Sequence, residues 1–223
     1  ALGRWSLVGP PGSSMTPTEH LAGRAELLLA RHGVLTREAV AAEELPGGFS
    51  AIYPVLRAAE EAGRIRRGYF VQGLGALQFA LPEAVERLRR HRDASPSHRA
   101  IVLAATDPAN PYGTILPWPE RPDALRAARS AGADVVLLEG RLAAWLSVRE
   151  DALLTYSHGL ASDEAERLRI AVAAALAAEV QRGAKPGLLI HSVDGRPVQS
   201  SDLAAALERA GFVRTHRGYL MRR

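Results

Sequence analysis

The sequence predicts an α+β protein, in which a winged helix-turn-helix domain at residues 16–93 precedes a β-barrel-like α+β domain at residues 100–223. Three helical patterns followed by a strand, a glycine-rich turn and a returning strand are the order of a winged helix. The remainder alternates many short apolar runs with two helical patterns, which is typical of a partly closed α+β barrel. The small and polar stretch between them predicts a linker at residues 94–99, where we expect limited proteolysis to separate the domains.

The first helix is preceded by residues 1–15, which are rich in Gly, Pro and Ser and predict another linker. A chain that begins in a linker is expected to be part of something longer. Thr16 and Glu19 form a capping-box pattern with Pro17 at the first helical position. Apolar residues then recur at helical spacing until Gly33, which predicts the end of the helix.

Two shorter helical patterns follow. Thr36 predicts the start of a helix that runs to about Glu44. Ser50 is the expected cap of the third helix and Gly63 its end. Pro54 then falls near the first turn, where its missing N–H has little effect.

The period changes after the third helix. Residues 64–71 and 77–81 predict two strands, and residues 72–75 (QGLG) predict the turn between them. Pro82 begins a further helix to about residue 92.

The second domain opens with the buried-type strand 100–104 and a Pro-rich loop. Ser162 is the expected cap of a long Ala-rich helix, and Ser201 that of a short one. The other predicted elements are a strand meander at 135–138, 142–146 and 152–156, the long helix to about residue 181, a strand at 188–193 and a last hairpin at 212–220.

Composition and charge exclude several classes of protein. The net charge is +4 and comes almost wholly from Arg, because Lys185 is the only lysine. The absence of Cys excludes disulfides, thiolate metal sites and Cys nucleophiles. No apolar run reaches membrane-spanning length and no signal peptide is evident, so we expect a cytoplasmic protein with no membrane partner. Without a P-loop or a metal-ligand motif, we expect no cofactor and no metal in this chain.

Arginines gather around the predicted wing and point to nucleic acid, because the guanidinium binds phosphate in a bidentate fashion. Residues 57–92 contain eight Arg but only four acidic residues, and residues 209–223 contain five Arg and no acidic residue. The alternative is a protein-interaction winged helix with solvated arginines, and Glu60 and Glu61 weaken the case for close base reading. The DNA-binding candidates are Ser50, Tyr53, Arg57, Arg64, Arg66, Arg67 and Tyr69.

Asp107, Asn110 and Tyr112 are the polar residues expected to meet on one loop of the second domain. A functional Asp107 would activate water or stabilise a developing cation, and it is the one catalytic candidate. Asp-Pro and Asn-Pro are also common turn formers, so a structural role is the alternative.

Several long motifs resemble the C-terminal region of Lhr-type (large helicase-related) superfamily-2 DNA helicases, and together they cover nearly the whole chain. They are residues 3–7 (GRWSL), 48–56 (GFSAIYPVL), 60–71 (EEAGRIRRGYFV), 73–76 (GLGA) with 78–79 (QF), 103–113 (LAATDPANPYG) and 206–212 (ALERAGF).

The resemblance implies a hydrolase, an ATP-dependent DNA-repair helicase of bacteria whose motor domains lie upstream. ATP and magnesium are therefore expected only for those motor domains. The expected partners are DNA, single-stranded or as a tailed duplex, and the upstream motor and winged-helix domains of the same protein. The same region is similar to AlkZ-type DNA glycosylases, but their Gln-x-Gln pair is not found here, since Gln72 and Gln78 are six residues apart.

Three functions follow as expectations. We expect a non-motor DNA-binding module that contacts DNA through the winged helix. The first alternative is a uracil-DNA glycosylase that uses Asp107, although we expect little or no excision from this chain alone. The second is an oligomerisation or protein-interaction module, in which the apolar meander pairs between subunits of a homo-oligomer.

Overall fold

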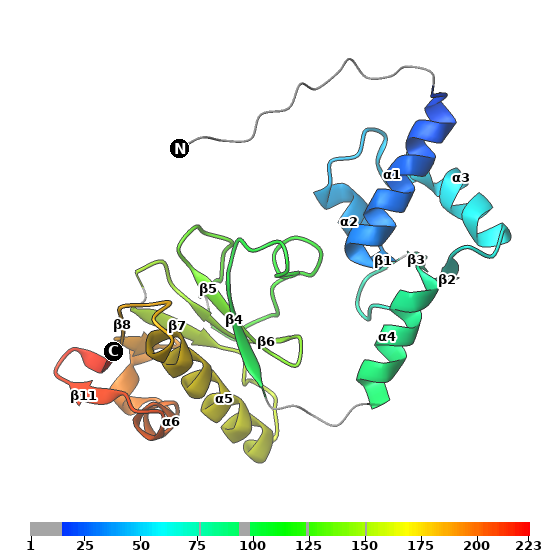
Figure 1. Cartoon of the computed structure of the whole chain (residues 1–223). Helices are drawn as coiled ribbons and strands as arrows, with labels where there is room; N and C mark the ends of the chain where they lie inside the picture. Colours follow the sequence, from blue (N-terminus) through cyan, green and yellow to red (C-terminus); the bar gives the residue numbers. More distant parts are fainter. Residues whose placement is uncertain (1–14, 76, 94–98, 124, 150) are drawn as a thin grey trace, which may run out of the picture. The chain divides into compact units, whose positions relative to one another are not determined.

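The computed structural model describes residues 15–75, 77–93, 99–123, 125–149 and 151–223, and Figure 1 draws the chain. The chain divides into two compact units, residues 1–94 and 95–223, and each buries apolar residues of its own. The two predicted linkers lie outside the described residues except for Met15 and Arg99. The proteolysis expected at the second linker therefore stays a prediction.

The first unit is the predicted winged helix. Its antiparallel sheet has the strand order β1-β3-β2. Leu35, Ile52, Leu56 and Phe79 are fully buried in its core. In chain order the elements are α1 (Pro17–His32), β1 (Val34–Leu35), α2 (Arg37–Ala42), α3 (Gly48–Glu61), β2 (Arg66–Gly68), β3 (Gln78–Ala80) and α4 (Pro82–Asp93).

The caps of the first two helices are those that the sequence predicts. The Glu19 N–H donates to Thr16 Oγ1 at 3.3 Å, while Glu19 Oε2 accepts the Thr16 N–H at 2.7 Å. The Thr36 hydroxyl accepts the Ala39 N–H at 3.1 Å. These local side-chain bonds satisfy N–H groups that the first helical turn leaves unpaired.

The start of α3 differs from the prediction. The helix begins at Gly48 and not after Ser50, because Gly47 turns the chain into the helix in a left-handed conformation (φ 77°). Pro54 therefore lies inside the helix, where its missing N–H removes one backbone hydrogen bond. The helix continues past it because Ile52 and Leu56 are anchored in the core.

The paired part of the wing is shorter than predicted. Only Arg66–Gly68 pairs with Gln78–Ala80, and the backbone from Tyr69 to Gly75 leaves the ladder. Most of the predicted hairpin is therefore loop, and its shape depends on side-chain hydrogen bonds.

The second unit holds two sheets. Six strands have the order β10-β9-β7-β6-β5-β4, and three have the order β11-β12-β8. The larger sheet is antiparallel except where β7 pairs in parallel with β9. In chain order the elements of the second unit are β4 (Ala100–Ala104), β5 (Asp134–Leu138), β6 (Arg141–Leu146), β7 (Ala152–Thr155), α5 (Ser162–Gln181), β8 (Gly187–Ile190), β9 (Ser192–Val193), β10 (Arg196–Pro197), the 3-10 helix η1 (Val198–Ser200), α6 (Ala204–Arg209), β11 (Val213–Thr215) and β12 (Gly218–Arg222).

The α+β character predicted for this unit is present, but its β-barrel-like closure is not confirmed, because neither sheet of this unit closes among the described strands. A barrel needs its two edge strands to pair, but β4 and β10 end the larger sheet on opposite sides. The predicted strand 188–193 is in fact β8 and β9, which belong to different sheets. The chain thus changes sheets where a barrel would have continued.

Both faces of the larger sheet are covered, as neighbouring residues of β5 show. Val136 packs into the core that α5 forms with this sheet, whereas Val135 and Leu137 pack on the opposite side with Tyr112 and Trp118. Alternate strand residues point to opposite faces. The α5 helix therefore covers one face, and the loop between β4 and β5 covers the other.

Two predicted caps and one predicted interface find no support in this unit. Ala161, and not Ser162, is the N-cap of α5, and α6 begins at Ala204 without a Ser201 cap. The meander strands β5, β6 and β7 each have two neighbours within the chain, so their edges are already paired. None of the helices in the described residues has the length and apolar character to cross a membrane.

Candidate functional site

The wing of the first unit is held by a buried glutamine. Gln78 is fully buried in β3, and its side-chain oxygen accepts the N–H groups of Phe70 at 2.9 Å and Val71 at 2.8 Å. Its amide donates to the carbonyls of Val71 at 3.0 Å and Leu74 at 3.4 Å. One side chain thus replaces the ladder bonds that the wing lacks and fixes its backbone.

The wing arginines differ in how far their charge is already balanced. Arg67 Nε lies 3.2 Å from Glu60 Oε1, and Arg64 Nη1 lies 3.9 Å from Glu26 Oε1. Arg66 is exposed and has no ion pair among the described residues. Of these three arginines, Arg66 therefore offers the least compensated charge to a ligand.

The other DNA-binding candidates separate into exposed and packed side chains. Tyr69 is 77% exposed beside the wing, and Ser50 is exposed on α3. Tyr53 instead contacts the rings of Phe49 and Phe79, with centroids 6.2 and 6.1 Å away. Tyr69 is thus free to stack on a base, while Tyr53 contributes to packing under α3.

Arg57, the DNA-binding candidate on α3 that carries a positive charge, forms an ion pair within the helix. Arg57 Nε lies 2.8 Å from Glu61 Oε1 one turn along the helix. The charge of Arg57 is therefore shared with its own helix.

In the second unit, the structure brings Asp107, Asn110 and Tyr112 onto one loop, as predicted. Asp107 Oδ1 accepts the Ala109 N–H at 2.7 Å, a bond that turns the chain. Asn110 is buried, donating to the Ala105 carbonyl at 2.9 Å and accepting the Tyr112 N–H at 3.1 Å.

Arg129, which follows this loop in the sequence, holds it through hydrogen bonds to its backbone. Its guanidinium donates to four carbonyls of the loop, those of Thr106, Asp107, Asn110 and Tyr112. The polar groups of this loop are therefore largely engaged with one another.

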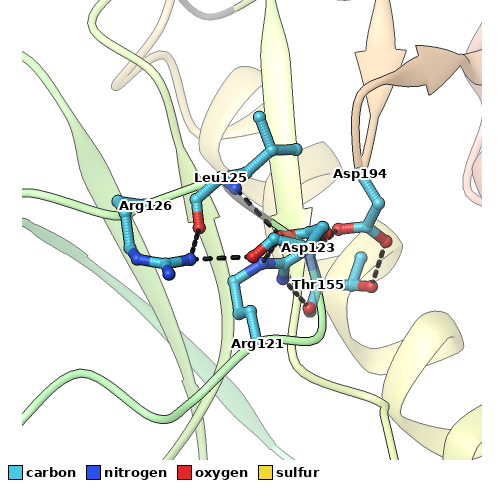
Figure 2. Close-up of polar contacts among 6 residues, drawn as sticks. All are labelled: Arg121, Asp123, Leu125, Arg126, Thr155 and Asp194. Atoms are coloured by element: carbon cyan, nitrogen blue, oxygen red, sulfur yellow. Dashed lines mark hydrogen bonds and ion pairs between the residues drawn. The ribbon is translucent and has the colours of Figure 1, made fainter.

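A second polar cluster, which the sequence analysis did not anticipate, lies around Arg121 (Figure 2). Its side chain is only 2% exposed and donates to two carboxylates: Nη2 lies 2.6 Å from Asp123 Oδ2 and 2.7 Å from Asp194 Oδ1. Thr155 completes the cluster, donating its N–H to Asp194 Oδ1 at 2.8 Å and its hydroxyl to Asp194 Oδ2 at 2.6 Å.

The electrostatics of the cluster follow from these contacts. Hydrogen bonds from Arg121 lower the pKa of Asp123, outweighing the opposing effect of burial. Burial lowers the pKa of Arg121, but its hydrogen bonds to Asp123 and Asp194 outweigh that effect and raise the pKa overall. One guanidinium between two carboxylates leaves the cluster with a net negative charge when both are ionised.

The two carboxylates face a cavity of about 540 Å³ between the β9–β10 turn, the start of α5 and η1. This volume lies within the range typical of ligand pockets. Its lining is polar and carries both signs of charge. The charged and hydroxyl-bearing residues are Asp123, Thr155, Ser157, His158, Arg169, Asp194, Arg196, Ser200, Ser201 and Asp202.

The side chains of Asp123, His158 and Asp194 place metal-ligating atoms within 4.8 Å of one another, the single such group in the described residues. A cation there would share the carboxylates with the Arg121 guanidinium, 2.6–2.7 Å away. This charge competes with a metal ion, so the arrangement favours a ligand with hydrogen-bonding groups.

The Arg121 cluster has no signature in the sequence because its members are distant in the chain. Arg121 and Asp194 are 73 residues apart. The local signal was Asp194-Gly195, a typical two-residue hairpin turn. Both residues have positive φ, 51° and 74°, and join β9 to β10.

The fold and its two sites define a class of protein: a winged-helix domain joined to an α+β unit that contains a polar cavity. The family model "Large helicase-related protein, winged-helix domain" matches residues 14–100. The chain is a C-terminal Lhr-type region and belongs to the large helicase-related family.

Two relatives support this membership across nearly the whole chain. "Lhr helicase/ probable uracil glycosylase" of Mycolicibacterium smegmatis is 45% identical over 99% of the chain. "Lhr helicase/uracil glycosylase" of Escherichia coli is 35% identical over 97% of it. The chain spans only 15% and 14% of the length of these relatives.

Proposed function

We propose that the chain is a non-motor DNA-binding module of an Lhr-type DNA-repair helicase and that it contacts DNA through its wing. The observation that carries the proposal is the pair Arg66 and Tyr69, both exposed on a wing that Gln78 holds in shape. An exposed cation and an exposed aromatic ring three residues apart on one wing suit a phosphate and an unstacked base.

The kind of DNA follows from the helicase names of the relatives. A translocating helicase supplies single strands and junctions with a duplex. We therefore propose single-stranded DNA or a tailed duplex as the partner, delivered by the upstream motor and winged-helix domains.

The test is the salt dependence of DNA binding in three variants. Arg66→Ala removes the uncompensated charge, the double variant Arg64→Ala/Arg67→Ala removes the two paired ones, and a triple variant removes all three. In the triple variant we expect weaker binding to all sequences alike, with a salt slope flatter by up to about 2–3 units. Arg66→Ala alone should account for the largest single share, because Arg64 and Arg67 are already paired.

Arg182→Ala is the matched control, because it removes one exposed arginine of the second unit that pairs with Glu179. It should leave the slope unchanged. Unchanged affinity in the folded triple variant would contradict contact through the wing, and the arginines between residues 214 and 223 would be examined next.

A second candidate function, base excision from DNA, is favoured by one specific observation. The second unit holds a cavity with two carboxylates on its wall, and both relatives carry "uracil glycosylase" in their names. Asp107, the carboxylate that the sequence suggests, remains a candidate for this reaction beside those two.

A further inference from the structure

The three-stranded sheet of the second unit carries an apolar row on the face that points away from the core. Tyr219 and Met221 of β12 are buried in the core that this sheet shares with α5. Because alternate strand residues point to opposite faces, Leu220 between them points to the other face. In the register of the sheet, Leu220 lies between Val213 of β11 and Leu189 of β8. These three side chains therefore form one row across the outer face.

The β11 end of this row is open. Val213 is 65% exposed, whereas Leu220 and Leu189 are partly buried. Among the described strands β11 pairs only with β12, so β11 is an edge strand. Every second residue of an edge strand turns its N–H and C=O away from the sheet. β11 therefore offers backbone donors and acceptors to a further strand, directly beside an exposed apolar side chain.

The charge around this edge is positive. Residues 209–223 contain five Arg and no acidic residue. Within the described part of the chain only one of the five, Arg209, forms an ion pair, with Glu166 Oε1 at 2.7 Å. Arg214, Arg217 and Arg222 are exposed. Their charges are therefore available to an acidic ligand.

Arg214 is the arginine closest to the open edge in sequence, because it follows Val213 on β11. It lies opposite Tyr219 in the register, on the face that Val213 does not share. The acidic side chain on that side, Glu208, accepts the Tyr219 hydroxyl at 2.5 Å and forms no ion pair with Arg214 in the described structure. The edge thus presents an apolar side chain on one face and a cation on the other.

The hairpin that carries these arginines is held in one shape. The Thr215 hydroxyl donates to the Gly218 carbonyl at 2.9 Å and accepts the Arg217 N–H at 3.2 Å. His191 Nδ1 lies 2.6 Å from the Arg217 carbonyl oxygen and ties the tip of the hairpin to the residue after β8. A ligand therefore binds a preformed backbone, which lowers the entropic cost of binding.

We propose that β11 binds an extended peptide, in which acidic and apolar residues alternate, as one additional strand of the sheet. Addition of a strand to a sheet edge is a known mode of peptide recognition. Side chains of neighbouring strands meet in pairs on each face. The apolar residues of the peptide therefore pack beside Val213, and its carboxylates pair with Arg214 on the opposite face. This protein-binding surface goes beyond the proposed DNA contact and lies on the other unit.

A nucleic-acid strand is the other ligand that a group of arginines suggests. It would use the arginines but not the open backbone groups of β11. Bases stack on aromatic rings, and the one ring on β8, β11 and β12 belongs to Tyr219, which is buried. An alternating peptide uses the edge, the apolar row and the charge together, so the observations favour a peptide.

The test uses the 223-residue chain and a fluorescein-labelled peptide of about ten residues, the length of one strand. In this peptide Asp alternates with Val, and fluorescence anisotropy measures its Kd. A peptide with Asn in place of Asp should bind at least about tenfold more weakly, the size of one charge-assisted hydrogen bond. A peptide with Lys in place of Asp should not bind.

Backbone methylation tests strand addition separately from charge. Two further Asp-Val peptides carry N-methyl groups on alternate residues, one on the Asp residues and the other on the Val residues. Both keep every side chain, but each lacks the N–H donors on one side of the strand. We expect one of the two to lose binding. Unchanged affinity of both peptides would contradict pairing with β11.

Variants of the chain locate the surface. Arg214→Ala should weaken binding of the Asp-Val peptide about tenfold, and Val213→Ser should weaken it about fivefold through lost apolar contact. The matched controls are Arg149→Ala and Val148→Ser, which change an exposed arginine and a 50% exposed valine in the turn between β6 and β7. Both controls should leave the Kd unchanged, and circular dichroism verifies that all four variants fold.

Three results overturn the proposal. The unmodified chain does not bind the Asp-Val peptide, or it binds the Asn peptide equally well, or Arg214→Ala weakens binding of a single-stranded oligonucleotide and not of the peptide. The last result assigns the hairpin to nucleic acid. The proposed DNA contact is tested independently, because the triple variant of the wing arginines should bind the peptide with unchanged affinity.

Discussion

At the scale of single residues, Gln78 decides the shape of the wing. Its replacement by Leu keeps the size but removes the acceptor of the Phe70 and Val71 N–H groups. We expect the first unit to lose about 1–3 kcal/mol of unfolding free energy, the cost of leaving buried polar groups unpaired. Urea denaturation followed by circular dichroism measures it.

The comparison for Gln78 is Gln72→Leu, a second glutamine of the wing that is exposed. It should change the unfolding free energy by no more than about 0.5 kcal/mol, as surface substitutions usually do. Equal effects of the two substitutions would show that Gln78 does not hold the wing.

Asp123 predicts a pH dependence of stability in the second unit. Arg121 holds its pKa below the ordinary 3.8, so the unfolded chain binds the proton more readily than the folded chain. The stabilisation is therefore complete above the ordinary pKa and is lost as the pH falls through the folded value. Between about pH 6 and about pH 3 we expect the melting temperature to fall less steeply in Asp123→Asn than in the unmodified chain.

The Asp163→Asn variant should follow the unmodified melting curve across the same pH range, because it changes an exposed carboxylate. Parallel curves for Asp123→Asn and the unmodified chain would mean that Arg121 does not perturb Asp123.

At the scale of elements, the last hairpin depends on a close approach of two strands. Gly218 begins β12 with φ 141°, and a Cβ there would lie 2.1 Å from the Ile190 carbonyl oxygen. Gly218→Ala should therefore destabilise the second unit by at least the backbone strain, about 1–3 kcal/mol. Thermal unfolding measures the change.

Gly23→Ala is the control for Gly218→Ala, because it makes the same substitution at a glycine with open space around it. Gly23 lies within α1, and a Cβ added there would meet no atom within 4 Å. The same substitution should there stabilise the first unit by about 0.5–1 kcal/mol, because alanine loses less backbone entropy in a helix. A stable Gly218→Ala variant would mean that β8 and β12 separate at little cost.

At the scale of the whole molecule, the two compact units should fold independently. Each buries its own apolar core, so residues 15–93 and 99–223 expressed separately should each unfold cooperatively. Their melting temperatures should match the two transitions of the whole chain in calorimetry. A single transition in the whole chain, shifted from both pieces, would instead indicate that the units stabilise each other.

The sequence by itself determined the features that depend on neighbouring residues. The Thr16 capping box, the winged-helix order and the turn-forming role of Asp107 all rest on contacts within a few residues. Long motifs also placed the chain in the Lhr family, which the relatives confirm. Local spacing carries this information because caps and turns are satisfied within one or two helical turns.

Only the tertiary structure decided which distant residues meet. The strands expected to form a partly closed barrel lie in two separate sheets, because residues 187–193 contribute a strand to each. The tertiary structure also paired Arg64 and Arg67 with Glu26 and Glu60, which leaves Arg66 with the least compensated charge of these three arginines. Finally it brought Asp194 to Arg121 across 73 residues. A buried guanidinium must be paired with carboxylates, and the fold brings these from distant parts of the chain. No pattern of neighbouring residues therefore predicts the pair.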